Sequence, residues 1–400
     1  MDGSDVDCGV QGGEGPSPLL LGVITLACGV LVANLYYAQP LIAAIAPALG
    51  IRQELAGSIV SVTQIGYGTG LFFLVSLADL VDNRRLVLAA LAATVLALVV
   101  QATSAGAPQF FLASFVVGVC STAAQVLVPF VAHLVPPARS GRAVGNVMAG
   151  LLTGIMLARP LALFVSGLAG WRTIFWASSV LVVAIGVALA RLMPPRKPGG
   201  GGNYGAVLIS MVGLLRSSRV LRRRAIYQGL MFSAFNLFWT AAPIMLADRF
   251  GLSQHGIALF ALAGAGGALA APLAGRVADR GHIRVATAGA MAAVALAFLP
   301  MAWARGTTGL LAMVVLTVIL DAAVQTNQVV SQRVIFAAPA HLRGRVNGIY
   351  MTILFAGGAL GSLLGTASYQ RGGWGTTVAI GVLMGAAALA LYLTEKPRAR

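Results

Sequence analysis

Apolar segments as long as a lipid bilayer is thick follow one another along almost the whole chain. A membrane-spanning helix needs about 20 predominantly apolar residues. Reading between charged, glycine and proline breaks gives two sets of six, at 19–38, 56–80, 86–105, 109–134, 143–167 and 172–192, and at 225–247, 254–277, 284–304, 309–334, 346–368 and 375–394. Charged residues make up 10% of the chain, against about 25% in soluble proteins. We therefore expect an all-α membrane protein with 12 transmembrane helices.

A polar interval at 194–224 separates the two sets, and it is rich first in proline and glycine and then in arginine. We expect it to be a cytoplasmic linker between an N-terminal bundle (19–193) and a C-terminal bundle (225–394). Within it, 204–218 is amphipathic enough to lie on the membrane surface. Residues 1–18 lack the basic start of a secretory signal, so we interpret them as a flexible tail, and 395–400 as a C-terminal tail.

The basic residues indicate the orientation. The chain has 27 Lys and Arg against 11 Asp and Glu, a formal net charge of +16. In a soluble protein such an excess suggests nucleic acid, but here the basic residues fall in short clusters between apolar segments, as cytoplasmic loops do. If both termini lie in the cytoplasm, most of the basic residues fall in cytoplasmic loops. Few lysines among many arginines suggest a bacterial genome, so we expect a multi-pass protein of the bacterial inner membrane with no nucleic-acid partner.

The second half of the chain repeats the first. Matching residues recur in order, 200 or 203 positions apart: Asp79 and Asp279, Arg84 and Arg284, Gln125 and Gln325, Gly141 and Gly344, Arg142 and Arg345, Gly170 and Gly373, and Trp171 and Trp374. Because six helices per repeat is an even number, both halves have the same topology. They are expected to be related by an axis along the membrane normal.

Loop motifs identify a family. The loops after the second helix of each half read Leu77-Ala-Asp-Leu-Val-Asp-Asn-Arg-Arg85 and Gly275-Arg-Val-Ala-Asp-Arg-Gly281, and a further segment reads Gly170-Trp-Arg-Thr-Ile-Phe-Trp176. Over about 19–394 the chain resembles the major facilitator superfamily. The segments 34–40, 63–67 and 125–129 are similar to its bacterial twelve-helix drug and metabolite exporters, which are drug:proton antiporters. The resemblance implies two pseudo-symmetric six-helix bundles around a central cavity that opens alternately to each side.

The sequence also departs from the family pattern. Val75, Leu80 and Asp82 replace a glycine, an arginine and a second glycine of the loop motif. Ser114 stands about where proton antiporters usually have an arginine, and Arg159-Pro160 stands where they have Gly-Pro. These differences leave a transporter without proton coupling as an alternative.

Asp321 lies near the middle of the predicted helix 309–334. A charge at the bilayer centre costs about 3 kcal/mol, and removal from water disfavours the ionised carboxyl, so a proton could bind and leave near neutral pH. Gln325, Gln328 and Gln332 continue the same helix face. We interpret Asp321 as the proton-coupling residue, with Gln325 and Gln328 in the substrate cavity. The alternative is a carboxyl group that is buried for structural reasons and satisfied by its neighbours.

Arg159 is the basic residue that lies well inside a predicted span. Three interpretations remain open. It could pair with Asp321 across the halves, bind an anionic substrate through two hydrogen bonds, or fill the interface between the halves.

Further polar residues fall on the helices that line the cavity in this family. The resemblance implies that Asn34 and Tyr37 of helix one, Gln125 of helix four and Asn236 of helix seven belong to the cavity. Tyr37 and Trp239 are equally explained as packing or as anchors at the membrane interface.

The repeated loops carry candidate gating residues, Asp79, Arg84, Arg85, Asp279 and Arg280. An acidic residue at a helix end can cap a neighbouring helix, and arginines can bridge the halves. The alternative is that the arginines only fix the orientation in the membrane.

No Walker loop, Cys/His metal cluster or catalytic motif stands in the sequence, so we expect neither enzymatic activity nor a cofactor. The predicted function is proton-coupled export of a small organic molecule, a drug or metabolite, by alternating access. The expected partners are the substrate, protons and the lipid bilayer, and the protein should act as a monomer. The alternatives are an uncoupled facilitator or an anion-linked transporter that uses Arg159. From another class, a transporter-like sensor or scaffold would need a large signalling loop, which the sequence does not contain.

Overall fold

The computed structural model describes residues 17–196, 203–268, 270–339 and 342–395. Most of the two predicted tails, 1–18 and 395–400, and residues 197–202 of the predicted linker lie outside this part of the chain. The described residues form α-helices and short 3-10 helices, and no strand occurs among them. The predicted all-α class is therefore confirmed.

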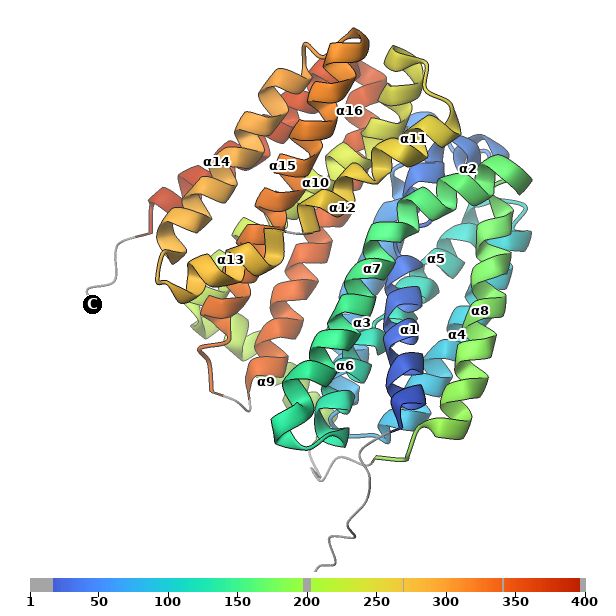
Figure 1. Cartoon of the computed structure of the whole chain (residues 1–400), viewed down its shortest axis with the longest axis vertical. Coiled ribbons are helices and arrows are strands. Elements are labelled where there is room, and N and C mark those ends of the chain that lie inside the picture. The colour runs from blue at the N-terminus through green and yellow to red at the C-terminus, as the bar shows by residue number, and fades with distance from the viewer. Residues whose placement is uncertain (1–16, 197–202, 269, 340–341, 396–400) are drawn as a thin grey trace, which may run out of the picture.

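The first half runs from α1 to α8 and forms one bundle (Figure 1). Its elements are α1 (Pro18–Ala33), η1 (Gln39–Leu41), α2 (Ile42–Ala48), η2 (Gln53–Leu55), α3 (Ser58–Leu77), α4 (Asn83–Thr103), α5 (Ala107–Ser121), α6 (Ala123–Leu134), α7 (Pro137–Ala169) and α8 (Arg172–Leu192). Non-helical residues follow α1, so the predicted span 19–38 ends in an irregular segment that leads to Pro40.

The second half forms the other bundle, preceded by α9 in the predicted linker. Its elements are α9 (Tyr204–Ser217), α10 (Arg219–Phe250), α11 (Gln254–Ala261), α12 (Ala263–Ala268), α13 (Ala270–Asp279), α14 (Ile283–Met301), α15 (Gly306–Ile335) and α16 (Arg343–Leu393). The predicted span 254–277 is thus interrupted at Leu262, between α11 and α12, whereas residue 269, between α12 and α13, lies outside the described residues. The 51-residue α16 covers two predicted spans and is interrupted at Gly373 (φ 66°, ψ −168°).

Nine helices of the described chain are long and apolar enough to cross a membrane. One of them is the interrupted α16, whereas α1 is only 16 residues long and α11–α13 are shorter still. The count of twelve spans and the cytoplasmic position of both termini therefore stay predictions.

The internal repeat is visible in the backbone. Gly170 and Gly373 both have positive φ, 85° and 66°, where the sequence places the matched Gly-Trp pairs. Gly50, just after α2, and Gly251, just after α10, also share positive φ, 68° and 63°. Because this region of φ favours glycine, the corresponding helix ends in both halves use the same turn.

Two close helix crossings occupy corresponding places in the halves. A Cβ atom added to Gly154 of α7 would lie 2.1 Å from the carbonyl oxygen of Gly29 in α1. A Cβ added to Gly357 of α16 would lie 2.2 Å from the carbonyl oxygen of Gly229 in α10. Small residues let helix backbones approach this closely, so a glycine–glycine contact brings two helices together in each half.

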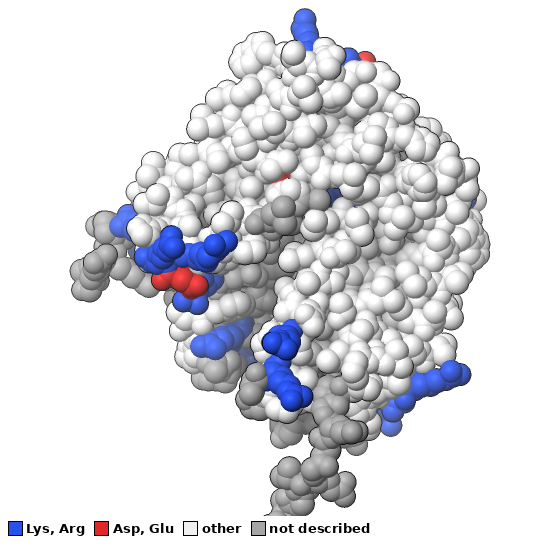
Figure 2. Space-filling model, viewed as in Figure 1, with Lys and Arg blue, Asp and Glu red and all other residues white. Residues whose placement is uncertain are grey.

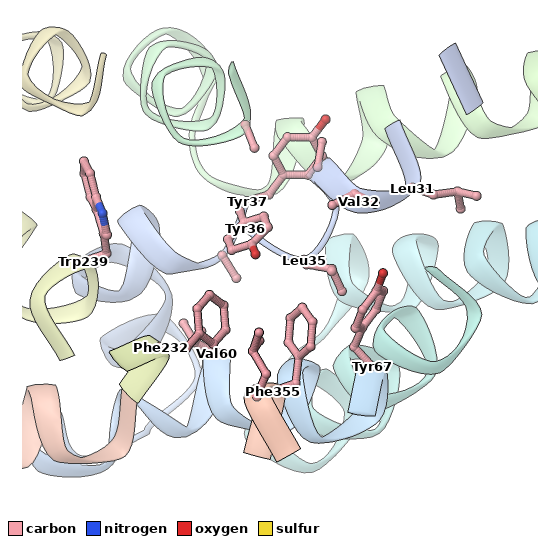
Figure 3. Packing of buried hydrophobic residues seen from close by; sticks show 14 of the residues in the cluster. Leu31, Val32, Leu35, Tyr36, Tyr37, Val60, Tyr67, Phe232, Trp239 and Phe355 are labelled. Atoms are coloured by element: carbon pink, nitrogen blue, oxygen red, sulfur yellow. The ribbon is translucent and has the colours of Figure 1, made fainter. Parts of the chain in front are cut away.

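Aromatic side chains fill the centre, where the two halves meet. Tyr36, Tyr67, Phe232, Trp239 and Phe355 are all buried there (Figure 3). The Tyr67 and Phe355 rings, one from each half, have centroids 4.5 Å apart. The interface between the halves therefore has an aromatic core, and the functional cavity lies beside it.

Charged groups gather at one end of the molecule. In Figure 2, arginines surround a hollow between the halves at the lower end, whereas most of the visible surface above is uncharged. Five arginines lie near the helix ends that meet at this end of the molecule: Arg84, Arg139, Arg196, Arg280 and Arg345. We call it the basic end.

Candidate functional site

A cavity of about 310 Å³ lies between the two halves. Such a volume suits a small organic ligand, because ligand pockets usually enclose about 300–1,000 Å³. Its polar and charged lining comes from both halves: Tyr36, Tyr67, Gln125 and Arg159 from the first, and Asp321, Gln325, Gln328, Gln332 and Asn347 from the second. The cavity thus combines groups that are far apart in the sequence.

Asp321 lies on α15 and is buried, with 7% of its surface exposed. Its Oδ1 atom accepts a 3.0 Å hydrogen bond from the indole Nε1 of Trp239 on α10. Within the described part of the chain, no side chain or backbone group bonds to Oδ2. One carboxylate oxygen is therefore fixed by the protein, and the other remains for a ligand or a proton.

Glycines of α12 make room for this carboxylate. A Cβ added to Gly264 would lie 2.9 Å from Oδ2 of Asp321 and 2.8 Å from Cζ2 of Trp239. A Cβ added to Gly267 would lie 2.3 Å from the Asp321 Cβ. Helix α12 therefore covers the Trp239–Asp321 pair closely because it has no side chains at these two positions.

Arg159 of α7 is enclosed by aromatic rings. The central carbon of its guanidinium lies 4.6 Å from the Trp239 ring centroid, 4.9 Å from that of Tyr36 and 5.2 Å from that of Phe235. Its Nε donates a 2.9 Å hydrogen bond to Oε1 of Gln39, whereas its buried Nη2 has no partner among the described residues. Cation–π attraction partly replaces the lost hydration, so the charge is held in place while one donor stays unused.

Arg159 and Asp321 do not form a direct ion pair. The ion pairs within the described residues join Arg333 to Asp279 (2.9 Å) and Arg371 to Glu54 (3.5 Å). Arg159 and Asp321 instead contact the same indole, one at the ring face and the other at Nε1. Trp239 thus links the two charges, and it is buried rather than placed at a membrane interface.

A hydrogen-bond network supports Arg159 from the other side. The Nε2 of Gln39 donates to Oδ1 of Asn236 (3.3 Å) and to Oγ1 of Thr240 (3.2 Å), and Gln64 donates to the same Asn236 oxygen at 2.5 Å. Gln39 and Gln64 belong to the first half and Asn236 and Thr240 to the second. The position of Arg159 therefore depends on how the halves are docked.

The structure brings together five of the predicted cavity residues, namely Gln125, Arg159, Asp321, Gln325 and Gln328, all of which line the cavity. Asn34, Tyr37 and Asn236 are buried but do not line it. Asn34 accepts a 2.7 Å hydrogen bond from Ser178 of α8, and Asn236 lies in the network around Gln39. Gln39 and Trp239 are polar and aromatic candidates that the sequence also offers on helices one and seven, and both contact Arg159.

The predicted gating residues lie at the basic end. Arg84 donates to the carbonyl of Ala190 at the end of α8, within its own half. Asp279 pairs with Arg333, also within one half. Asp79 lines a second pocket of about 510 Å³. Arg85 and Arg280 are exposed.

The second pocket leads toward the central cavity. It is also lined by His133, Arg196, Arg343 and Arg345, and it shares Gln125 and Asn347 with the cavity. The second pocket therefore adjoins the cavity on the side of the basic end.

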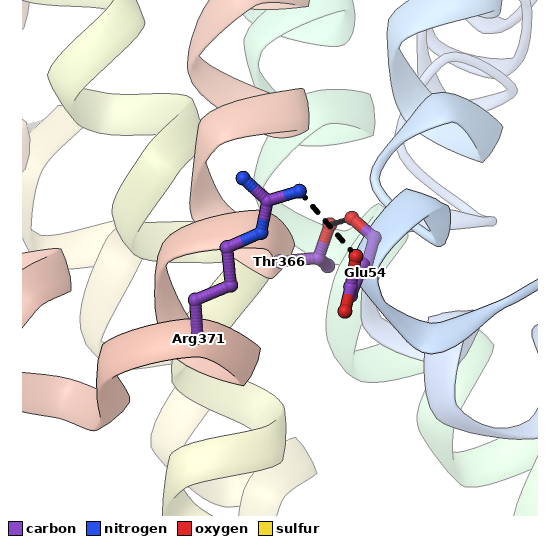
Figure 4. Close-up of polar contacts among 3 residues, drawn as sticks. All are labelled: Glu54, Thr366 and Arg371. Atoms are coloured by element: carbon purple, nitrogen blue, oxygen red, sulfur yellow. Dashed lines mark hydrogen bonds and ion pairs between the residues drawn. The ribbon is translucent and has the colours of Figure 1, made fainter.

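The opposite end is closed by contacts between the halves (Figure 4). The Oγ1 of Thr366 on α16 accepts a 2.9 Å hydrogen bond from the Gly57 N–H and donates one of 3.1 Å to the Glu54 carbonyl. Arg371 and Glu54 add an exposed ion pair, and Ser61 donates to the Ala359 carbonyl at 2.6 Å. We call the contacts of Glu54 and Gly57 with Thr366 and Arg371 the latch.

Comparisons with known proteins agree with this architecture. A model of the major facilitator superfamily matches residues 24–352 and 228–400. The chain is 38% identical over 376 residues to the "Uncharacterized transporter YgaY" of Escherichia coli O157:H7, covering 94% of each chain. It is 26% identical to the "Chloramphenicol resistance protein" of Streptomyces lividans, covering 94% of this chain and 96% of the other. Among solved structures, a bacterial homologue of the human lysosomal transporter Spinster superposes with a TM-score of 0.73 at 14% identity, over 94% of this chain and 97% of that one.

Proposed function

The chain belongs to the major facilitator superfamily and is a multi-pass membrane transporter, and on this premise we propose that it exports a small organic molecule from the bacterial cytoplasm in exchange for protons. The observation that carries the proposal is the Asp321 carboxylate, which is buried in a cavity between the halves and has one oxygen without a partner among the described residues. A proton and a substrate can compete for that oxygen. Competition of this kind couples their movements when the affinities differ between two access states.

The proposal assigns the basic end to the cytoplasm, as the positive-inside rule requires. The described conformation is then open toward the cytoplasm, through the second pocket, and closed outside by the latch. A cytoplasmic substrate can reach Asp321 in this state. Twelve spans, two cytoplasmic termini and action as a monomer in the inner membrane are part of the same proposal.

Vesicle transport tests the coupling. The resistance protein at 26% identity makes chloramphenicol the first candidate substrate. In everted membrane vesicles, acidification of the lumen should drive chloramphenicol inward, and nigericin, which collapses the pH gradient, should abolish this accumulation. Vesicles without the protein provide the background. Protein-dependent flux that ignores the pH gradient would contradict proton coupling.

A second candidate function is transport of an anion without proton coupling. It is favoured by the buried Nη2 of Arg159, a donor without a partner among the described residues. Guanidinium groups bind carboxylate and phosphate through two hydrogen bonds. In this case flux of the anion would persist without a pH gradient and would be lost in Arg159→Gln.

The latch gives a prediction about conformation. Thr366→Val keeps the shape of the side chain but removes both latch hydrogen bonds. At about 1 kcal/mol each, their loss should shift the ratio of latch-open to latch-closed molecules roughly thirtyfold. Spin labels at Gln53 and Gln370, on either side of the latch, would report a larger population of long distances.

Thr376→Val is the matched control, because Thr376 lies on the same helix and bonds only to the Gly372 carbonyl. The control should leave the distance distribution unchanged. Identical distributions in wild type and Thr366→Val would show that these hydrogen bonds do not hold the halves closed.

A further inference from the structure

The charges of the cavity restrict what it can bind. Arg159 and Asp321 are the charged groups among its described lining residues. With Asp321 ionised, these charges cancel, and with Asp321 protonated the cavity carries one positive charge. When a substrate has taken the place of the proton, Asp321 is ionised, and a ligand with a net charge would then leave one charge uncompensated in an apolar surrounding, which is costly.

Each of the two charged groups has an atom that could make a hydrogen bond but has no partner among the described residues. The Nη2 of Arg159 is a buried donor without a partner, and Oδ2 of Asp321 is an acceptor without a partner in the described chain. Both groups contact the indole of Trp239. The cavity therefore presents a donor and an acceptor around one aromatic ring.

The rest of the wall is apolar. It is formed mainly by Leu151, Ile155 and Met156 of α7, Phe232 and Phe235 of α10, and Phe355 of α16. Aromatic and apolar side chains with a few placed polar groups suit a ligand with an aromatic or aliphatic body. Such a body can pack on the wall while its polar groups reach Arg159 and Asp321.

From this arrangement we propose that the substrates have no net charge and carry two polar groups on an apolar body: a hydrogen-bond acceptor for Arg159 and a donor for Asp321. The inference deepens the proposed function and rests on it. The ligand's donor needs the ionised carboxylate, so binding releases the proton of Asp321 to the solvent. One substrate then exchanges for one proton. A monoanion would be balanced only while Asp321 keeps its proton, so it should bind without proton release and could not be exchanged for that proton.

A matched ligand series tests the inference on the full-length protein in lipid nanodiscs. All four probes are nitrobenzenes that differ at the para position: 4-nitrobenzyl alcohol has both polar groups, 4-nitrotoluene lacks the donor, 4-nitrobenzoate is an anion and 4-nitrobenzylammonium is a cation. Isothermal titration in two buffers of different ionisation enthalpy gives both affinity and proton release. The alcohol should bind about tenfold more tightly than the others, the factor expected for one hydrogen bond to a charged group, and should release one proton.

The outcomes separate the substrate class from the proton exchange. Preferred binding of the alcohol without proton release would support the substrate class and contradict the proton exchange. Proton release by the ammonium compound, with weak binding of the alcohol, would overturn the substrate class and leave the exchange standing. Absence of measurable binding by all four probes would also overturn the substrate class.

Arg159→Gln should weaken binding of the alcohol about tenfold, since the charged donor is lost. Arg249→Gln is the control, because Arg249 is exposed at the end of α10 and does not line the cavity. Equal affinities in both variants would exclude the contact with Arg159. If Arg159→Gln does not fold, the ligand series on the wild type still decides the inference.

Discussion

Asp321→Asn is expected to reduce pH-driven accumulation of the substrate to the level of vesicles without the protein. Asparagine has the same shape, and its Oδ1 can still accept the hydrogen bond that Trp239 donates at 3.0 Å. The amide cannot bind and release a proton. Residue 321 can therefore no longer carry the proton that is exchanged for the substrate. This is the largest expected effect on transport, because it removes the driving force rather than one contact.

A second readout separates lost coupling from lost folding. Exchange of labelled for unlabelled substrate requires no net movement of protons, so it should persist in Asp321→Asn. Asp248→Asn is the control for a lost carboxylate, since Asp248 is exposed and bonds to Tyr369 away from the cavity. If Asp321→Asn still accumulated substrate along a pH gradient, another residue would have to carry the proton.

Gly154→Ala is expected to cause the largest loss of stability. The added Cβ would lie 2.1 Å from the carbonyl oxygen of Gly29, and neither backbone can move without displacing its helix. Overpacking of this kind costs about 1–3 kcal/mol and occasionally more. The thermal unfolding midpoint, measured by gel filtration of heated detergent samples, should fall by several degrees.

Gly145→Ala in the same helix provides the matched control. No atom lies within 4 Å of a Cβ added there, and alanine favours a helix over glycine by about 1 kcal/mol. The control should therefore be neutral or slightly stabilising. Gly357→Ala should behave like Gly154→Ala, because it makes the corresponding crossing with Gly229. Equal midpoints for Gly154→Ala and Gly145→Ala would show that α1 and α7 can separate at little cost.

The sequence predicted the helices well where apolar periodicity was uninterrupted. The predicted span 172–192 coincides with α8, Arg172–Leu192. The span 254–277 was predicted as one helix, but the structure interrupts it at Leu262, where α11 ends and before α12 begins. Helix α9 was also predictable, as the amphipathic segment 204–218, and its place on the membrane surface stays a prediction.

The site was predictable only in part. Asp321 and Arg159 could be found because a charge inside an apolar segment is costly and needs an explanation. The sequence could not show whether Trp239 belongs to the site or anchors the protein at the membrane interface. Its role comes from a contact with Asp321, which lies 82 residues further along the chain. Asn34 and Asn236 are polar residues on helices of the cavity, but the sequence does not determine helix rotation closely enough to show that they face their neighbours instead.

The repeat has a consequence for how this cavity could arise. Ser362 corresponds to Arg159 in the repeat, and Ser121 corresponds to Asp321. A symmetric pair of first halves would bring two arginines to the centre, and a pair of second halves two aspartates. Opposite charges can contact one indole here because the two halves differ at these positions. The single covalent chain is thus a condition for an electrically balanced binding site, in addition to a means of holding two bundles together.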